Sequence, residues 1–124
     1  MTKILFFFFF SCISVYAVDW ISYKEALELQ KKNHKIIMID VVKPDCRYCS
    51  NMETQVFDDL YMEEWLEERF IMVKMNLYTE TLPLGIKPIV TPSFYFVNHK
   101  QEIVKNINGS WNIQDFKDLT ENIK

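Results

Sequence analysis

The sequence predicts an α/β domain in which a central, mixed four-stranded sheet is flanked by helices. Three observations support this fold class. Segments with helical periodicity alternate with short apolar runs rich in β-branched residues, which favours parallel pairing of the first strands. The last two strand-like runs are joined by a tight polar connection, which favours antiparallel pairing. An amphipathic segment near the C-terminal end predicts a final helix.

Residues 1–17 have the composition of an export signal. Lys3 gives a positive start, residues 4–10 are an unbroken apolar run, and small residues offer a cleavage site before residue 18. A membrane anchor is the alternative, but a bilayer core needs about 20 apolar residues, and Asp19 interrupts the run too early. We therefore expect a cleaved signal peptide and a periplasmic protein.

Residues 18–124 are expected to form the mature protein, whose length fits one domain with one core, and we expect a monomer. The formal net charge is -3, and it becomes -4 without the leader, which carries one Lys and no acidic residue. This mild acidity and the lack of a clustered basic surface argue against a nucleic-acid partner. Lipid attachment at Cys12 is a minor alternative that would anchor the same domain to a membrane.

A capping box predicts the first helix, which runs to Asn33. Ser22 provides the cap and Glu25 follows three residues later. Residues 36–42 then form a short apolar run with many β-branched members, which is typical of a strand buried on both faces. We expect this strand to lie in the centre of the sheet.

A second and a third helix are predicted between the first two strands. Residues 43–45 break the first strand, and a helix capped by Asp45 is expected to begin at Cys46 and to pass toward residue 54. Asp59 can cap the third helix, which ends near residue 69. The apolar run 70–77 follows as a second buried strand.

The C-terminal part predicts a hairpin and one more helix. Residues 78–90 are loop-like, and strands 93–97 and 102–107 are joined by the connection 98–101. Gly109 ends the sheet. Asn112 can cap the last helix, whose apolar face contains Ile113, Phe116, Leu119 and Ile123.

Cys46 and Cys49 are the only cysteines after residue 17. A loop this short constrains the unfolded chain little, so reactivity explains the pair better than stability does. At the first turn of a helix the two thiols can form a disulfide, and the helix dipole and free N–H groups stabilise the leading sulfur as a thiolate. Such sites lower a thiol pKa from about 8.5 to roughly 3.5–7.5. Cys46 is therefore the expected attacking sulfur and Cys49 the resolving one.

The charges near Cys46 act in opposite directions. Arg47 and Lys43 favour the thiolate, whereas Asp45 disfavours it. A metal site is the alternative use of the pair, but zinc needs four ligands and only one Cys pair is present. Copper, which soft thiolates can bind, remains open, with His34 and His99 as the only histidines able to add a ligand.

Asp40 and Lys74 are the lone charged residues within their strand-like runs. Unpaired buried charges are costly, so an ion pair between them is one interpretation, which would place Asp40 beneath Cys49 as a proton relay. The alternative is that each side chain reaches water at a strand end. Thr91-Pro92 precedes a strand, where proline is tolerated and where a cis bond is one option.

These features together resemble the thioredoxin superfamily over nearly all of residues 18–124. The segments that carry the resemblance, in chain order, are Asp40, the Cys-x-x-Cys pair 46–49, 73–76, Gly85-Ile86, Thr91-Pro92 and Gly109. The stretch 52–58, followed by Trp65-Leu66 and Phe70, is similar to exported single-domain thioredoxins and to the C-terminal domain of the transmembrane thiol:disulfide interchange reductase.

The resemblance implies a thioredoxin-like fold and a set of catalytic roles. Cys46 would be the nucleophile, Cys49 the resolving thiol, Asp40 the buried proton acceptor and Lys74 its partner. The family usually has an aromatic residue where this chain has Asp45. It also usually has a strand before the first helix, for which little sequence is available here.

The resemblance also implies how substrates are bound and where electrons come from. Pro92 would be a cis-proline beside the disulfide, and Thr91 would offer backbone hydrogen bonds to the substrate. Arg47 and Tyr48, between the cysteines, are expected to contact it. The implied partners are protein disulfides and a membrane-embedded thiol reductase as electron donor, with no cofactor and no resident metal.

The leading functional hypothesis is a protein-disulfide reductase acting on exported proteins. An oxidase is the same chemistry in reverse, since direction depends on which redox form the fold stabilises more. A copper-handling protein that uses the two thiols is the alternative from another class. A binding module that uses the groove at Pro92 without turnover is the third.

Overall fold

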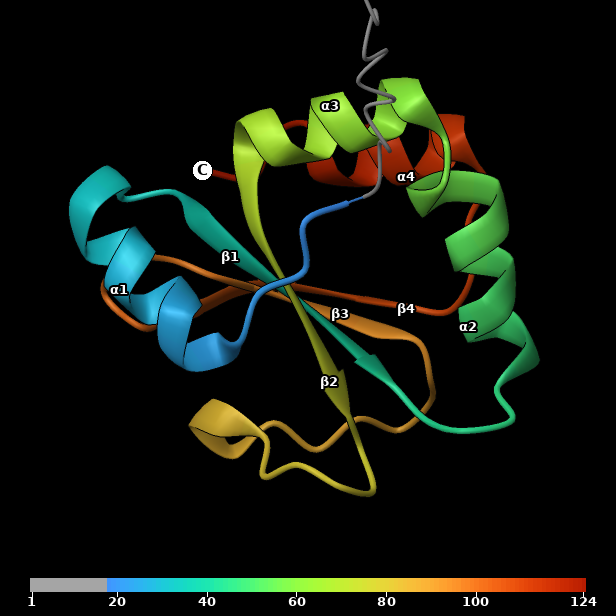
Figure 1. Ribbon diagram of the computed structural model, residues 1–124, viewed down its shortest axis with the longest axis horizontal. Helices are drawn as coiled ribbons and strands as arrows, with labels where there is room; N and C mark the ends of the chain where they lie inside the picture. Colours follow the sequence, from blue (N-terminus) through green and yellow to red (C-terminus); the bar gives the residue numbers. More distant parts are fainter. Residues whose placement is uncertain (1–17) are drawn as a thin grey trace, which may run out of the picture.

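The computed structural model describes residues 18–124 (Figure 1). The predicted signal peptide 1–17 and the lipid-attachment alternative at Cys12 lie outside the described residues. Among the described helices, none has both the length and the apolar character that crossing a bilayer requires.

The described chain alternates helices with four strands, in the predicted order. The elements are α1 (Tyr23–Asn33), β1 (Ile36–Val42), α2 (Arg47–Met52), the π-helical turn η1 (Glu53–Phe57), α3 (Leu60–Arg69), β2 (Phe70–Asn76), the short 3₁₀ turn η2 (Pro83–Gly85), β3 (Ser93–Val97), β4 (Ile103–Asn108) and α4 (Ile113–Thr120). Each predicted strand is present, with ends that differ from the prediction by at most one residue.

The strands form one mixed sheet in the order β2-β1-β3-β4. The pair β1 and β2 is parallel, and the pairs β1–β3 and β3–β4 are antiparallel. The predicted fold class, a thioredoxin-like mixed four-stranded sheet flanked by helices, is confirmed. Ahead of α1, Ile21 makes only a single parallel bridge to Val73, so the first strand typical of this fold is reduced to one residue pair.

The predicted helix caps are confirmed at three helices and wrong at one. Ser22 and Glu25 form the capping box of α1, and Asp59 and Asn112 cap α3 and α4 through their side-chain oxygens. Asp45 does not cap α2. It has a left-handed backbone (φ 55°), and the cap position belongs to Cys46, whose sulfur accepts the Cys49 N–H.

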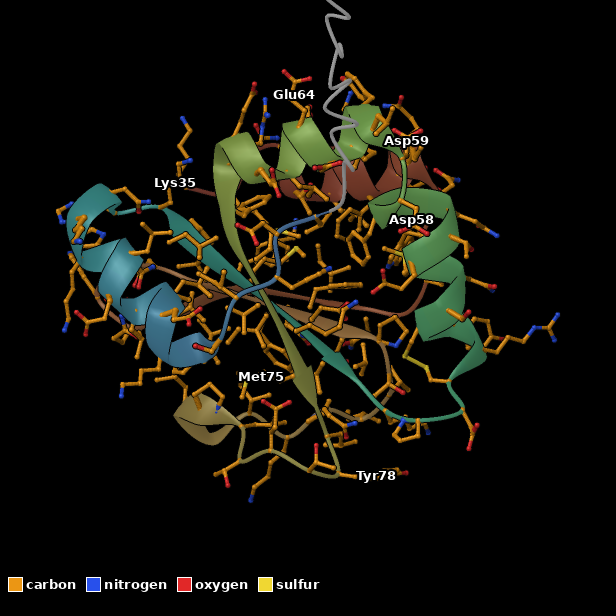
Figure 2. The ribbon with its side chains drawn as sticks, viewed as in Figure 1. Lys35, Asp58, Asp59, Glu64, Met75 and Tyr78 are labelled. Carbon is orange, nitrogen blue, oxygen red and sulfur yellow. A yellow bond between two sulfur atoms is a disulfide. The ribbon has the colours of Figure 1, made fainter. Side chains whose placement is uncertain are left out.

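The two faces of the sheet are covered by different elements, because successive strand residues point to opposite sides. One face packs against α2, η1, α3 and α4 around a cluster of interlocking aromatic rings. The other face packs against α1 and the loop after β2. Figure 2 shows the labelled Met75 on the side of that loop, while Tyr78 points away from the domain and is 69% exposed.

Candidate active site

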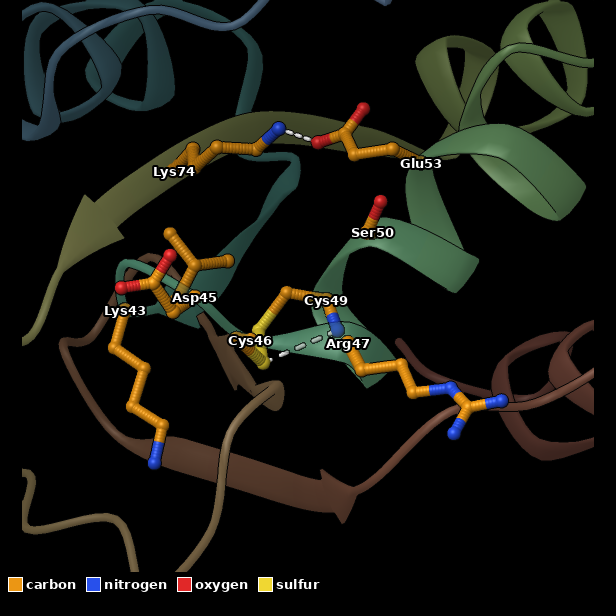
Figure 3. Close-up of a pocket in the computed structure, with 9 residues that line it drawn as sticks. Lys43, Asp45, Cys46, Arg47, Cys49, Ser50, Glu53 and Lys74 are labelled. Carbon is orange, nitrogen blue, oxygen red and sulfur yellow. Dashed lines mark hydrogen bonds and ion pairs between the residues drawn. A yellow bond between two sulfur atoms is a disulfide. The ribbon is translucent and has the colours of Figure 1, made fainter.

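The site lies where β1 passes into α2. Cys46 and Cys49 are joined by a disulfide, with their Cα atoms 5.2 Å apart. Cys46 has an extended backbone and precedes the first helical residue, and its sulfur accepts the backbone N–H of Cys49 at 3.2 Å (Figure 3). Cys46 is half-buried and Cys49 is only 8% exposed. Cys46 is therefore the more accessible of the two cysteines.

The Thr91-Pro92 peptide bond lies against the leading cysteine and is cis. The carbonyl oxygen and the hydroxyl oxygen of Thr91 are 3.5 Å and 3.4 Å from the Cys46 sulfur. The carbonyl of Pro92 accepts the Gly109 N–H at 2.8 Å, which ties this loop to the end of β4. Residues 45 positions apart in the chain thus form one edge of the site.

Arg47 and Tyr48 lie between the two cysteines, in the first turn of α2. Both side chains are exposed, Tyr48 at 61%. Their contact with substrate stays a prediction.

A surface hollow of about 620 Å³ opens beside the disulfide (Figure 3). It is lined by Val42, Lys43, Asp45, Cys46, Arg47, Cys49, Ser50, Glu53 and Lys74. Five of these side chains are charged.

Asp40 lies on the same face of β1 as the core under α2 and η1, and it is 1% exposed. Burial raises the pKa of its carboxyl from 3.8 to about 7, and the positive charge of Lys74 partly opposes that rise. Within the described part of the chain, its Oδ1 has no hydrogen-bond partner. A buried carboxyl of this kind can take up or release a proton near neutral pH.

Lys74 is opposite Asp40 in the parallel register of β1 and β2. The predicted ion pair between them is not formed, because the Lys74 ammonium pairs with Glu53 instead. The ammonium also lies over the Trp20 ring, 4.3 Å from its centre. Burial lowers the pKa of Lys74, and the charge of Asp40 opposes this shift.

Glu53 is the site residue that sequence reasoning missed. It follows Cys49 by four positions, which on a helix places the two side chains on the same face. That spacing was the available signal. The π-helical turn that begins at Glu53 then directs its carboxylate toward β2 rather than into solvent.

The titration of Asp40 predicts how the stability of the oxidised protein depends on pH. Because the folded-state pKa lies above the ordinary 3.8, the folded state holds the proton more tightly between about pH 4 and pH 7. The Asp40 contribution to stability is full below this window and is lost as pH rises through it, by about 1.4 kcal/mol per pH unit.

We expect Asp40→Asn to remove this dependence of the free energy of unfolding on pH, measured by urea unfolding between about pH 4 and pH 7. The exposed carboxylate Asp58 provides the control, since Asp58→Asn should keep the slope; equal slopes in all three proteins would contradict the prediction.

The two histidines lie away from the disulfide. His34 caps the end of α1, and His99 is in the turn between β3 and β4, so both are beyond the N-terminal end of β1 while Cys46 follows its C-terminal end. Their rings stack on each other with centres 4.6 Å apart. Residues 18–124 contain no group of three or more His, Cys, Asp or Glu side chains arranged to hold a metal ion. The histidines therefore do not complete a copper site with the two thiols.

A mixed sheet, a Cys-x-x-Cys disulfide at a helix start and a cis-proline beside it define the class of thioredoxin-like proteins. A family model for the thioredoxin-like domain matches residues 23–124. The chain belongs to this family. The family and the cysteine pair together support thiol–disulfide chemistry. No curated protein matches the chain.

Solved structures share the fold at low sequence identity. A DsbH oxidoreductase superposes with a TM-score of 0.70 at 17% identity, covering 98% of this chain and 92% of that one. A thioredoxin from Thermus thermophilus has a TM-score of 0.68 at 28% identity, covering 86% and 87%. The oxidised C-terminal domain of DsbD from Neisseria meningitidis has a TM-score of 0.60 at 16% identity, covering 86% of this chain and 100% of that one.

Proposed function

We propose that the protein is a thiol:disulfide oxidoreductase that reduces disulfides of exported proteins. The observation that carries the proposal is the position of the Cys46 sulfur, which is accessible beside Thr91 and faces a backbone N–H at the start of α2, with Cys49 buried behind it. The leader-like residues 1–17 support an exported location.

The reaction consists of two exchanges starting from the dithiol. The Cys46 thiolate attacks one sulfur of the substrate disulfide, a mixed disulfide forms, and the other substrate sulfur leaves as a thiolate that is protonated by water. Cys49 then gives its proton to the Asp40 carboxylate and attacks the Cys46 sulfur. The second substrate sulfur leaves, so two electrons have passed to the substrate and the enzyme disulfide seen in the structure remains.

The remaining residues have roles in binding. Thr91 and Pro92 are proposed to align the substrate backbone, and Arg47 and Tyr48 to contact its side chains. A membrane-embedded thiol reductase is proposed to return the disulfide to the dithiol by the same exchange chemistry.

The carboxylates around the pair support reduction as the direction. Asp45 directly precedes Cys46 and Glu53 lines the same hollow as the two cysteines, and negative charge disfavours a thiolate, while Lys43 and Arg47 act in the opposite direction. Destabilising the reduced form makes the dithiol a better electron donor, the opposite of the strongly oxidising proteins whose reduced form is stabilised.

Equilibration with glutathione buffers tests the direction. We expect a reduction potential near the thioredoxin value of about -270 mV. A potential near about -120 mV, typical of strong oxidants, would overturn reduction as the direction. Insulin-disulfide reduction in the presence of a strong copper chelator tests the class of function: activity should persist, and activity that disappears with the chelator would overturn the proposal in favour of metal handling.

A further inference from the structure

The position of the Lys74 ammonium is unexpected for a residue whose cross-strand neighbour is a buried carboxyl. The register pairs Lys74 with Asp40 directly, and opposite residues on neighbouring strands have side chains close enough to interact. An ion pair between them would relieve the cost of burying both groups. Instead the ammonium pairs with Glu53 (Figure 3). It also lies over the Trp20 ring, and Asp40 Oδ1 has no hydrogen-bond partner among the described residues.

We propose that Glu53 is a positioning residue that, together with Trp20, holds the Lys74 ammonium away from Asp40 and so leaves Asp40 free to accept the proton of Cys49. The proposal rests on the function proposed above. It assigns to Glu53 an action exerted through Lys74, without contact between Glu53 and the reacting sulfurs.

The geometry of three separate segments supports this role. Glu53 opens the π-helical turn after α2, so its backbone position is fixed by the same helix that carries Cys49. The Trp20 ring packs edge-on against the Phe57 ring of that turn, with the ring centres 5.2 Å apart. The side chains of Lys74 and Glu53 are only 28% and 33% exposed, which shields their ion pair from water.

The charged groups around Asp40 are few. Lys74 on β2 is the charged group that lowers the pKa of Asp40. On β3, the residue opposite Asp40 is the apolar Phe94. On the helical side, Cys49 and Glu53 line the hollow that Lys74 also lines. At the outer rim of the hollow are the charged side chains of Lys43, Asp45 and Arg47. Lys74 is thus the group whose movement would change the proton affinity of Asp40 most.

Moving a lysine ammonium next to a carboxyl lowers the pKa of that carboxyl by about 1 to 3 units. In the wild-type protein the ion pair with Glu53 prevents this, and the pKa of Asp40 stays at about 7. A carboxyl held there can both take the Cys49 proton and return it in the reverse exchange, whereas a carboxylate paired with Lys74 would be a weak base.

Carboxyl ¹³C NMR titration of Asp40 in the oxidised protein tests the inference, because the disulfide removes the cysteines from the titration. The Asp40→Asn protein assigns the signal. We expect Glu53→Gln to lower the Asp40 pKa by about 1 unit or more, and Glu53→Asp to preserve most of the wild-type value. Glu64→Gln, the same change of charge on the outer side of α3, should leave the titration unchanged.

A double-mutant cycle separates positioning from a direct charge effect. In a Lys74→Met background, Glu53→Gln should no longer lower the Asp40 pKa, because the ammonium that Glu53 controls is gone. A shift of the same size in both backgrounds would overturn the inference, as would an unchanged pKa in Glu53→Gln alone. Trp20→Leu is a further variant. It removes the ring that lies over the Lys74 ammonium without a change of charge, and it should lower the Asp40 pKa, as Glu53→Gln does.

The pH profile of insulin reduction is the second measurement, and it separates this inference from the proposed function. The part of the pH–rate profile that disappears in Asp40→Asn reports the titration of Asp40. In Glu53→Gln, the midpoint of that part should move to lower pH by the same amount as the Asp40 pKa measured by NMR. A wild-type protein without exchange activity at any pH would reject the proposed function, while the NMR titration would still decide whether Glu53 positions Lys74. An active wild type whose profile is the same in Glu53→Gln would overturn the inference alone.

Discussion

Cys49→Ser is expected to convert the protein into a covalent trap for its substrates. Cys46 remains accessible beside Thr91 and can still attack a disulfide. Serine cannot then displace the substrate from the mixed disulfide, because its hydroxyl is a far poorer nucleophile than a thiolate at neutral pH. Partners should accumulate as adducts that are visible on a non-reducing gel, vanish with dithiothreitol and can be identified by mass spectrometry.

Cys46→Ser is the matched control for the trapping experiment. It keeps the buried sulfur at position 49, which is 8% exposed, and removes the accessible one. We expect no adducts and a loss of insulin reduction by about a thousandfold or more, the scale on which removal of a nucleophile acts. Adducts that form through Cys49 in this variant would show that the two sulfurs have the opposite roles.

Phe57→Ala is expected to have the largest effect on stability. The Phe57 ring is 1% exposed and makes edge contacts with the rings of Trp20, Phe94 and Phe116, at 5.2 Å, 6.0 Å and 6.1 Å between centres. Removing such a side chain loses its transfer free energy and leaves a cavity, at a cost of about 3 to 5 kcal/mol. Urea unfolding of the oxidised protein should show a much lower midpoint.

Tyr78→Ala is the control for this prediction, because it removes an aromatic ring that is 69% exposed. Its free energy of unfolding should stay within about 0.5 kcal/mol of the wild-type value. A loss of less than about 1 kcal/mol in Phe57→Ala would mean that the surrounding rings close the space, and it would contradict the prediction.

Most of the fold could be predicted because its signals are local. The run 36–42 is apolar except for Asp40 and lies in the centre of the sheet. The caps at Ser22, Asp59 and Asn112 each require only a side chain and the next turn of the same helix. The predicted start of α2 was one residue too early, because aspartate is a common helix cap but Asp45 adopts a left-handed backbone. Its cap position is taken by a cysteine, a residue type outside the usual set.

The site was only partly predictable because some of its contacts depend on tertiary structure. The Cys pair and Thr91-Pro92 follow from spacing and resemblance, and the structure brings them together. The partner of Lys74 depends on the direction in which a π-helical turn points Glu53, and no local pattern specifies that direction. Register alone favoured Asp40 as the partner.

The hydrogen bond from the Cys49 amide to the Cys46 sulfur exists while that sulfur is still bonded to Cys49. When the protein is reduced again and the mixed disulfide at Cys46 is resolved, negative charge therefore develops on a sulfur that already faces an N–H group at the beginning of α2. Stabilisation of this kind is strongest when the donors need no reorganisation at the moment of reaction. The same backbone N–H group can thus serve the Cys46 sulfur both in the disulfide and as a thiolate.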